Sequence, residues 1–243
     1  MNNFRILLTC VLMMTVISPV SHVFGQDSMN GVDASGKKQG RWEKRDEQGA
    51  LIYTGQFESD VPIGKFIYYY PGGEVKAISF HVDPGVREQM VIYHQNGQIM
   101  AQGNYFETKK ESTWTYYDEA GKLISSENYD KGIRTGIWRT YYLNGNTSEE
   151  LYWRRDKKEG PWNQYYSDGS KKLTAFYSDN LRNGDLHLYF PNAQLMVKGL
   201  YVNDKREGEW IYYTEEGQLQ KIRQYSNGYM ISEVVYIEVE EEK

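Results

Sequence analysis

Histidine and carboxylate side chains are the residues of this chain whose types could support metal or acid–base chemistry. His81 and His94, with Asp83 between them, could meet across adjacent strands and ligate a metal, since imidazole and carboxylate groups are common zinc ligands. No spacing rule fixes that geometry, and His81 occupies a position that is aromatic elsewhere in the chain. A packed ring is therefore the favoured interpretation of His81, and we expect no metal site.

The sequence lacks the motifs of common enzyme classes. It holds no Gly-x-Ser-x-Gly elbow, phosphate-binding glycine loop or His-Glu-x-x-His pair. Cys10 is the single cysteine, which argues against disulfides and cysteine zinc sites. Neighbouring acids such as Glu149 and Glu150 point to opposite faces of a strand, so they are surface charges by default. We expect neither enzyme activity nor a cofactor.

A basic cluster beside a tryptophan is the strongest candidate for contact with a partner. Trp153 is followed by Arg154, Arg155, Lys157 and Lys158, the largest positive cluster in the chain. Cationic side chains form charge-assisted hydrogen bonds with carboxylates, and an exposed indole adds apolar contact area. The alternative interpretation is a solvated loop beside a buried core residue. We predict these five residues as partner-binding residues.

The elements that position these residues follow a strict repeat. An apolar anchor recurs every 24 residues through eight consecutive units without an insertion or deletion. A fixed period of this length indicates stacked supersecondary units in place of one globular core. The anchors are Trp42, Phe66, Met90, Trp114, Trp138, Trp162, Leu186 and Trp210.

Each unit has the pattern of a β-hairpin. A tyrosine follows the anchor by three residues and a glycine by seven, each in seven of the eight units. Aromatic and β-branched runs bounded by glycine turns are typical of strands. The residue before the glycine is often Gln, Ala or Glu, which disfavour positive φ. We therefore predict a type I turn with one left-handed glycine, a G1 bulge.

This turn also sets the register. The tyrosine should pair with the Leu or Val position of the second strand, with the anchor on the opposite face. The sequence thus predicts an all-β chain, a linear array of about eight 24-residue antiparallel β-hairpin repeats forming an elongated curled sheet. Its 22 Tyr and six Trp either form the core of this thin ribbon or leave one stripe exposed for sugars or a partner.

The segments outside the array have distinct compositions. Residues 1–25 have the charged start, apolar run and small-residue end of a cleaved signal peptide. Residues 26–39 are a polar leader, 40–228 the eight repeats, and 229–243 a capping strand with the acidic tail Glu240 to Glu242. We expect export to the periplasm, cell surface or medium after cleavage near Gly25. The formal net charge of −5 argues against nucleic-acid binding and against a polybasic grip on membranes.

The repeat resembles a known family. Tyr-Tyr-x-x-Gly with Gly-x-Trp is similar to the membrane occupation and recognition nexus (MORN) repeat, in its bacterial, antitoxin-like variant. Residues 136–145, 160–169 and 208–213 carry the motif best, whereas units one and three depart most. The resemblance implies stacked antiparallel hairpins and an interaction role. Choline-binding repeats share the residue types, but their period is shorter.

These observations favour an exported, non-enzymatic repeat protein that acts as a protein-binding or envelope scaffold module. The alternative is a glycan or cell-wall binding module that uses exposed aromatic rings. A protein partner is our expectation, a glycan is the second, and membrane-surface contact is not expected from the net charge.

Overall fold

The computed structural model describes residues 29–237. Across this range the chain forms one open sheet of 19 strands and contains no helix. The expected signal peptide at 1–25, the first leader residues and the acidic tail Glu240 to Glu242 lie outside the described residues. The predicted all-β hairpin array is confirmed.

The strands follow the 24-residue frame. Each unit contributes two of them, and the first is interrupted in units five and seven. Their bounds are β1 (Gly40–Arg45), β2 (Leu51–Glu58), β3 (Val61–Tyr69), β4 (Val75–Asp83), β5 (Arg87–Tyr93), β6 (Ile99–Phe106), β7 (Lys109–Tyr117), β8 (Leu123–Asp130), β9 (Ile133–Arg134), β10 (Gly136–Tyr141), β11 (Thr147–Arg154), β12 (Lys157–Tyr165), β13 (Lys171–Ser178), β14 (Leu181–Arg182), β15 (Gly184–Tyr189), β16 (Leu195–Val202), β17 (Lys205–Tyr213), β18 (Leu219–Ser226) and β19 (Tyr229–Val235).

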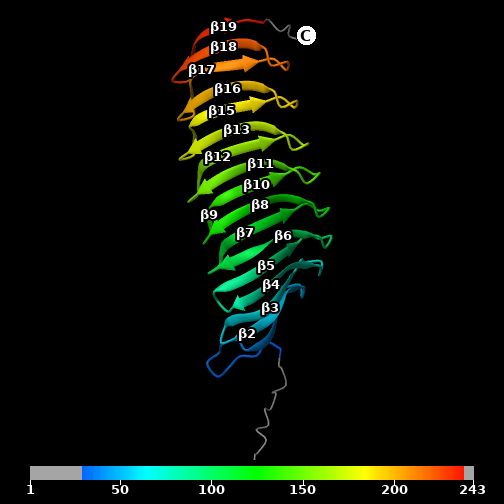
Figure 1. Ribbon diagram of the computed structural model, residues 1–243. Coiled ribbons are helices and arrows are strands. Elements are labelled where there is room, and N and C mark those ends of the chain that lie inside the picture. Colours follow the sequence, from blue (N-terminus) through cyan, green and yellow to red (C-terminus); the bar gives the residue numbers. More distant parts are fainter. Residues whose placement is uncertain (1–28, 238–243) are drawn as a thin grey trace, which may run out of the picture.

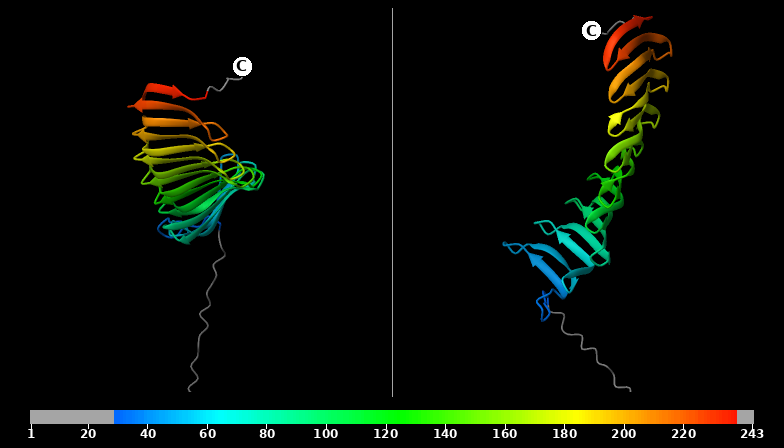
Figure 2. Two further views of the ribbon diagram at one scale, coloured as in Figure 1. Left: turned by 45° about the horizontal axis from the view of Figure 1, so that its top comes forward. Right: turned by 90° about the vertical axis from the view of Figure 1, so that its left-hand side faces the viewer.

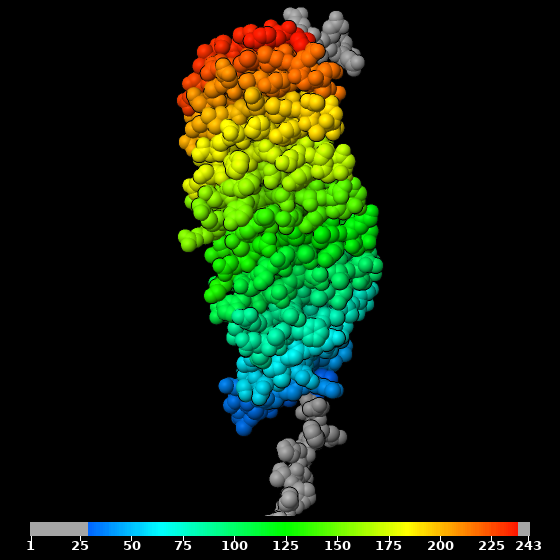
Figure 3. Space-filling model, viewed as in Figure 1, coloured from blue at the N-terminus to red at the C-terminus, as the bar shows by residue number. Residues whose placement is uncertain are grey.

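Successive long strands pair antiparallel, and the two halves of each interrupted strand, β9 with β10 and β14 with β15, both pair with the strand before them. The sheet therefore grows along the chain from β1 to β19. The strands bend, and the sheet twists along its length (Figure 2). The hairpins follow one another without a break in the molecular surface (Figure 3). The long axis of the molecule is therefore the repeat axis.

The hairpin turns have the predicted geometry. In unit five the Gly145 N–H donates to the Tyr142 carbonyl at 2.9 Å, and the Tyr142 N–H donates to the Asn146 carbonyl at 2.8 Å. Gly145 has φ 89°, whereas Asn144 before it is not left-handed. This is a type I turn closed by a G1 bulge. The same pair of hydrogen bonds recurs in all eight units, and Ala193 takes the glycine position in unit seven with φ 65°.

The predicted register is confirmed as well. Tyr141 pairs with Thr147, and Tyr213 pairs with Leu219. The anchors lie on the other face, where Trp114 is 1% exposed and Trp210 is 2% exposed. We call this side of the sheet the anchor face and the side that carries the paired tyrosines the tyrosine face.

The connections between units are tight turns. Most are two-residue turns whose central residues both have positive φ, such as Arg155 (51°) and Asp156 (66°). A turn of this kind matches the right-handed twist of the flanking strands. The units are therefore joined by hairpins at both ends, which makes the sheet one continuous meander.

Rings on the anchor face pack over small residues of the neighbouring strand. A Cβ atom placed on Gly103 would lie 2.4 Å from the Trp114 ring, and one on Gly199 would lie 2.3 Å from the Trp210 ring. Between units six and seven, Ala175 and the smaller Leu186 occupy the equivalent positions within one core cluster. The anchor face is thus the core of the protein.

Units one and three form hairpins despite their departures from the pattern. In unit three, Glu88 replaces the usual left-handed glycine, and β4 and β5 pair through His81 and Glu88. In unit one, residues before β1 fold back on it, where the Asn30 N–H donates to the Arg41 carbonyl at 2.8 Å. Both units therefore keep the hairpin geometry.

We predict that Gly145→Val lowers the free energy of unfolding by about 1–3 kcal/mol, because a β-branched residue is strained at positive φ. The space around Gly145 is open, with no atom within 4 Å of an added Cβ, so backbone strain is the cause. Thermal or denaturant unfolding measures the effect, and Gly145→Asn is the matched control because asparagine tolerates this conformation. An unchanged stability of Gly145→Val would contradict the G1 bulge.

Gly103→Ala should destabilise by about 1–3 kcal/mol for a different reason, since the added methyl group overpacks the site against Trp114. The effect should shrink in a Trp114→Leu background, which reproduces the Ala175 and Leu186 pairing found further along the sheet. A double-mutant cycle by denaturant unfolding measures this coupling. Equal costs of Gly103→Ala in both backgrounds would rule out the ring-over-glycine contact.

Candidate functional site

The predicted basic cluster lies at the turn between β11 and β12. Arg155 and Asp156 form the tip of this turn. Successive residues of a strand point to opposite faces, so Trp153 lies on the anchor face whereas Arg154 lies on the tyrosine side. The five predicted residues are therefore divided between two faces of the sheet.

Trp153 is a core residue, which corrects its prediction as a surface contact. Its side chain is 7% exposed and packs against Trp138 with ring centroids 5.2 Å apart. The Arg134 guanidinium lies 4.0 Å from its ring centroid. Lys158, across the turn, has its ammonium group 6.0 Å from Trp153 and 5.0 Å from the Tyr177 ring. Trp153 and Lys158 thus stabilise the sheet.

These contacts belong to a row along the anchor face in which cations alternate with aromatic rings. Each cation pairs with the ring of the preceding strand, as Arg182 does with Tyr177 and Arg206 with Tyr201. Each also lies over rings of its neighbours at cation–π distance. The row from unit four onwards is Lys110, Tyr129, Arg134, Trp153, Lys158, Tyr177, Arg182, Tyr201, Arg206 and Tyr225.

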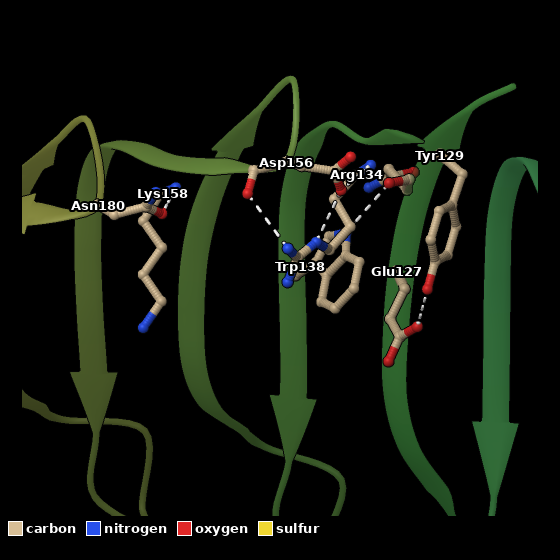
Figure 4. Close-up of polar contacts among 8 residues, drawn as sticks. Glu127, Tyr129, Arg134, Trp138, Asp156, Lys158 and Asn180 are labelled. Carbon is tan, nitrogen blue, oxygen red and sulfur yellow. Dashed lines mark hydrogen bonds and ion pairs between the residues drawn. The ribbon is translucent and has the colours of Figure 1, made fainter. Parts of the chain in front are cut away.

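The turn acids hold this row in place. The Asp156 carboxylate accepts hydrogen bonds from the Arg134 backbone N–H at 3.0 Å and from Arg134 Nε at 2.9 Å, as Figure 4 shows. These bonds lower the pKa of Asp156 below its usual value. Arg182 makes the same two bonds with Asp204, and the Lys158 N–H donates to Asn180. Units five, six and seven are each hydrogen-bonded in this way to the turn that leads into the next unit.

One tyrosine of this row pairs with a carboxylate. The Tyr129 hydroxyl donates to Glu127 Oε2 at 2.7 Å (Figure 4). Burial, together with this hydrogen bond, raises the pKa of Tyr129. The phenol is therefore held in its protonated form, in which it donates to Glu127.

The remaining basic residues are exposed at the turn. Arg154 pairs with Glu159 at 2.9 Å, and Lys157 pairs with Asp179. With Arg155 and Ser178 they line a shallow depression that carries three cationic and two acidic groups. Exposed ion pairs of this kind contribute little stability, so their charges are available for exchange with a ligand.

An apolar stripe adjoins this depression on the tyrosine face. Tyr152 pairs with Ile137, and Phe176 pairs with Pro161 on the next hairpin. Phe176 is 47% exposed, Tyr152 is 38% exposed, and Leu200 one hairpin further is 36% exposed. Sequence reasoning named Trp153 and missed its neighbour Tyr152. The sequence signal for Tyr152 is the alternation of strand residues, because a residue next to a buried one points to the opposite face of the sheet.

His81 and His94 make separate contacts in the structure. His81 Nε2 lies 4.0 Å from Glu88 Oε1, and the His81 ring packs edge-on against Phe66. His94 Nε2 lies 3.0 Å from the Tyr117 carbonyl oxygen, at the hairpin turns. Within residues 29–237, no group of three or more His, Cys, Asp or Glu side chains could hold a metal ion. No helix in this range is long and apolar enough to cross a membrane.

Comparison with solved structures gives only distant likenesses. A TcdB2–TccC3–Cdc42 complex is 13% identical, with a TM-score of 0.20 over 81% of this chain and 15% of that one. A porin-like protein from Bacteroides uniformis is 12% identical, with a TM-score of 0.20 over 79% of this chain and 91% of that one. The Photorhabdus luminescens Tc holotoxin pore is 14% identical, with a TM-score of 0.19 over 84% and 16%. No curated protein matches the chain.

The family of MORN repeat variants matches four segments, residues 89–107, 110–131, 134–154 and 206–227. These segments fall in units three, four, five and eight of the frame. Unit three is thus matched despite its irregular turn, whereas the segment 160–169 lies outside the matched ranges. MORN repeats are in general protein- or membrane-binding modules. The chain therefore contains MORN repeats of the variant type in these four units.

Proposed function

We propose that this chain is an exported, non-enzymatic module that binds another protein through the tyrosine face of units five to seven. The observation that carries the proposal is the exposed apolar stripe beside the basic turn, on the face that the core does not use. We call this surface the outer patch, and it consists of Ile137, Tyr152, Pro161, Phe176, Leu200, Arg154, Arg155 and Lys157.

The outer patch fits a protein segment that has apolar and acidic side chains. Large aromatic residues such as Tyr152 and Phe176 supply most of the affinity when a partner excludes water from them. Arg154 and Lys157 hold their acidic neighbours in exposed ion pairs, which a partner carboxylate can replace at small cost. We therefore expect the cations to orient the bound segment and the rings to supply most of the affinity for it.

The proposal includes export, which depends on the predicted signal peptide at 1–25. N-terminal sequencing of the protein from its native host should give a first residue near Gln26 in an extracytoplasmic fraction. Met1 on a soluble cytoplasmic protein would contradict export without affecting the binding proposal.

Binding is tested by capture of envelope proteins, with and without chemical crosslinking, followed by mass spectrometry. Phe176→Ser should lower recovery of the partner at least tenfold, because it removes an exposed ring from the centre of the outer patch. Phe80→Ser is the matched control, since Phe80 is 45% exposed at the same repeat position in unit two, away from the basic turn. Equal recovery by both variants would contradict the outer patch.

Trp153→Ala separates stability from recognition in the same assay. Truncation of a buried tryptophan costs about 3–5 kcal/mol, so this variant should show a lower melting temperature, unlike Phe176→Ser. A Trp153→Ala protein that melts normally and loses its partner would contradict the core role of Trp153. Binding of purified protein to a glycan array with loss in Phe176→Ser would favour the glycan alternative.

A further inference from the structure

The first strand of the sheet is covered by the chain itself. The Asn30 N–H donates to the Arg41 carbonyl at 2.8 Å, and the Asn30 side chain accepts from the Glu43 N–H at 2.8 Å. The Trp42 indole donates to the Gly31 carbonyl at 3.1 Å. Asn30 and Gly31 therefore occupy the middle of the edge of β1 that would otherwise be open to another strand.

The last strand has no such cover among the described residues. All seven residues of β19 are exposed, and Tyr229 is 77% exposed, Ile231 64% and Met230 55%. β19 pairs with β18 on one side only. An exposed apolar strand with unpaired backbone groups is a template for pairing with a further strand.

β19 takes the place of a first strand in the repeat order. It follows β18 across a two-residue turn at Asn227 and Gly228. Val234, 24 residues after Trp210, pairs with Ile222 and so lies one residue out of the register that places Met90 opposite Ser79. Inner first strands such as β3 and β17 are paired on both sides. The returning strand that would pair with the outer side of β19 is not present in residues 29–237.

The sequence of β19 is complementary to itself. In an antiparallel pair of two β19 strands aligned over their full length, Ser232 faces Ser232 of the second copy. Tyr229 then faces Val235, Met230 faces Val234, and Ile231 faces Glu233. Glu233 is the single charged residue of β19 and pairs with Arg223 of its own chain. No like charges are opposed in this register.

We propose that β19 pairs with β19 of a second copy of this chain, with the two-fold axis at Ser232, so that two sheets join end to end. A two-fold contact uses the same strand twice and closes at a dimer. Growth of a filament through β1 is opposed because Asn30 already occupies the backbone groups of Arg41 and Glu43 on that edge. The outer patch lies on another part of the molecule and stays free in the dimer.

The mass of the purified chain, measured by light scattering over a concentration series, tests this assembly. We expect twice the monomer mass for the native sequence and the monomer mass for Ser232→Lys, which would place two ammonium groups opposite each other at the axis. Ser232 is exposed, so the melting temperature of the Ser232→Lys monomer should reach at least that of the diluted native protein. A native protein that is monomeric throughout the series overturns the proposal.

Disulfide trapping tests the register. Antiparallel partners have Cα atoms about 4.5–5.5 Å apart, which is within the range of a disulfide. In a Cys10→Ser background, Ser232→Cys should give a covalent dimer under mild oxidation, whereas the exposed control Ser178→Cys should not. A dimer that persists in Ser232→Lys and is not trapped by Ser232→Cys places the contact elsewhere and overturns the proposal. Loss of partner capture in Phe176→Ser has no bearing on this result.

Discussion

The packing of an aromatic ring over a small residue of the next strand is the contact on which this sheet depends. A single-layer ribbon has no second layer to cover its core, so each unit must bury the rings of its neighbour. Trp114 reaches 1% exposure because Gly103 lets the ring approach the backbone of β6. Aromatic contacts such as that between Trp114 and Tyr105, 4.9 Å between centroids, contribute about 0.5–1.5 kcal/mol beyond burial. Stability therefore accumulates along the array.

The same packing divides the two faces of the sheet by role. The anchor face is closed by rings and by the cations that lie over them, so Arg134 and Lys158 act as part of the core although both are charged. On the tyrosine face of units five to seven, by contrast, residues such as Phe176 remain exposed. A partner can therefore use the tyrosine face without disturbing the contacts that hold the units together.

Much of the fold could be predicted because it depends on local rules that repeat. The period, the G1 bulge at Gly145 and the pairing of Tyr141 with Thr147 follow from turn chemistry and strand alternation. The site was harder to predict, because the face of the sheet on which Trp153 lies depends on the tight two-residue turn at Arg155 and Asp156. Positive φ at a non-glycine residue such as Arg155 is imposed by the flanking strands, so composition alone does not reveal it.

The dependence of each unit on its neighbour also explains why the two ends differ. Within residues 29–237 no repeat hairpin precedes unit one, and residues of the leader lie against its rings instead. The Lys38 ammonium group is 4.9 Å from the centroid of the Trp42 ring and 4.6 Å from that of the Phe57 ring. At the other end Tyr225 is 6% exposed because Arg206 and β19 flank it. β19 thus completes the core of unit eight, and in doing so it moves the open edge one strand outward without removing it. Each strand added to such an array pairs its inner edge and leaves its outer edge unpaired. The open edge is therefore closed only by a contact other than a further repeat.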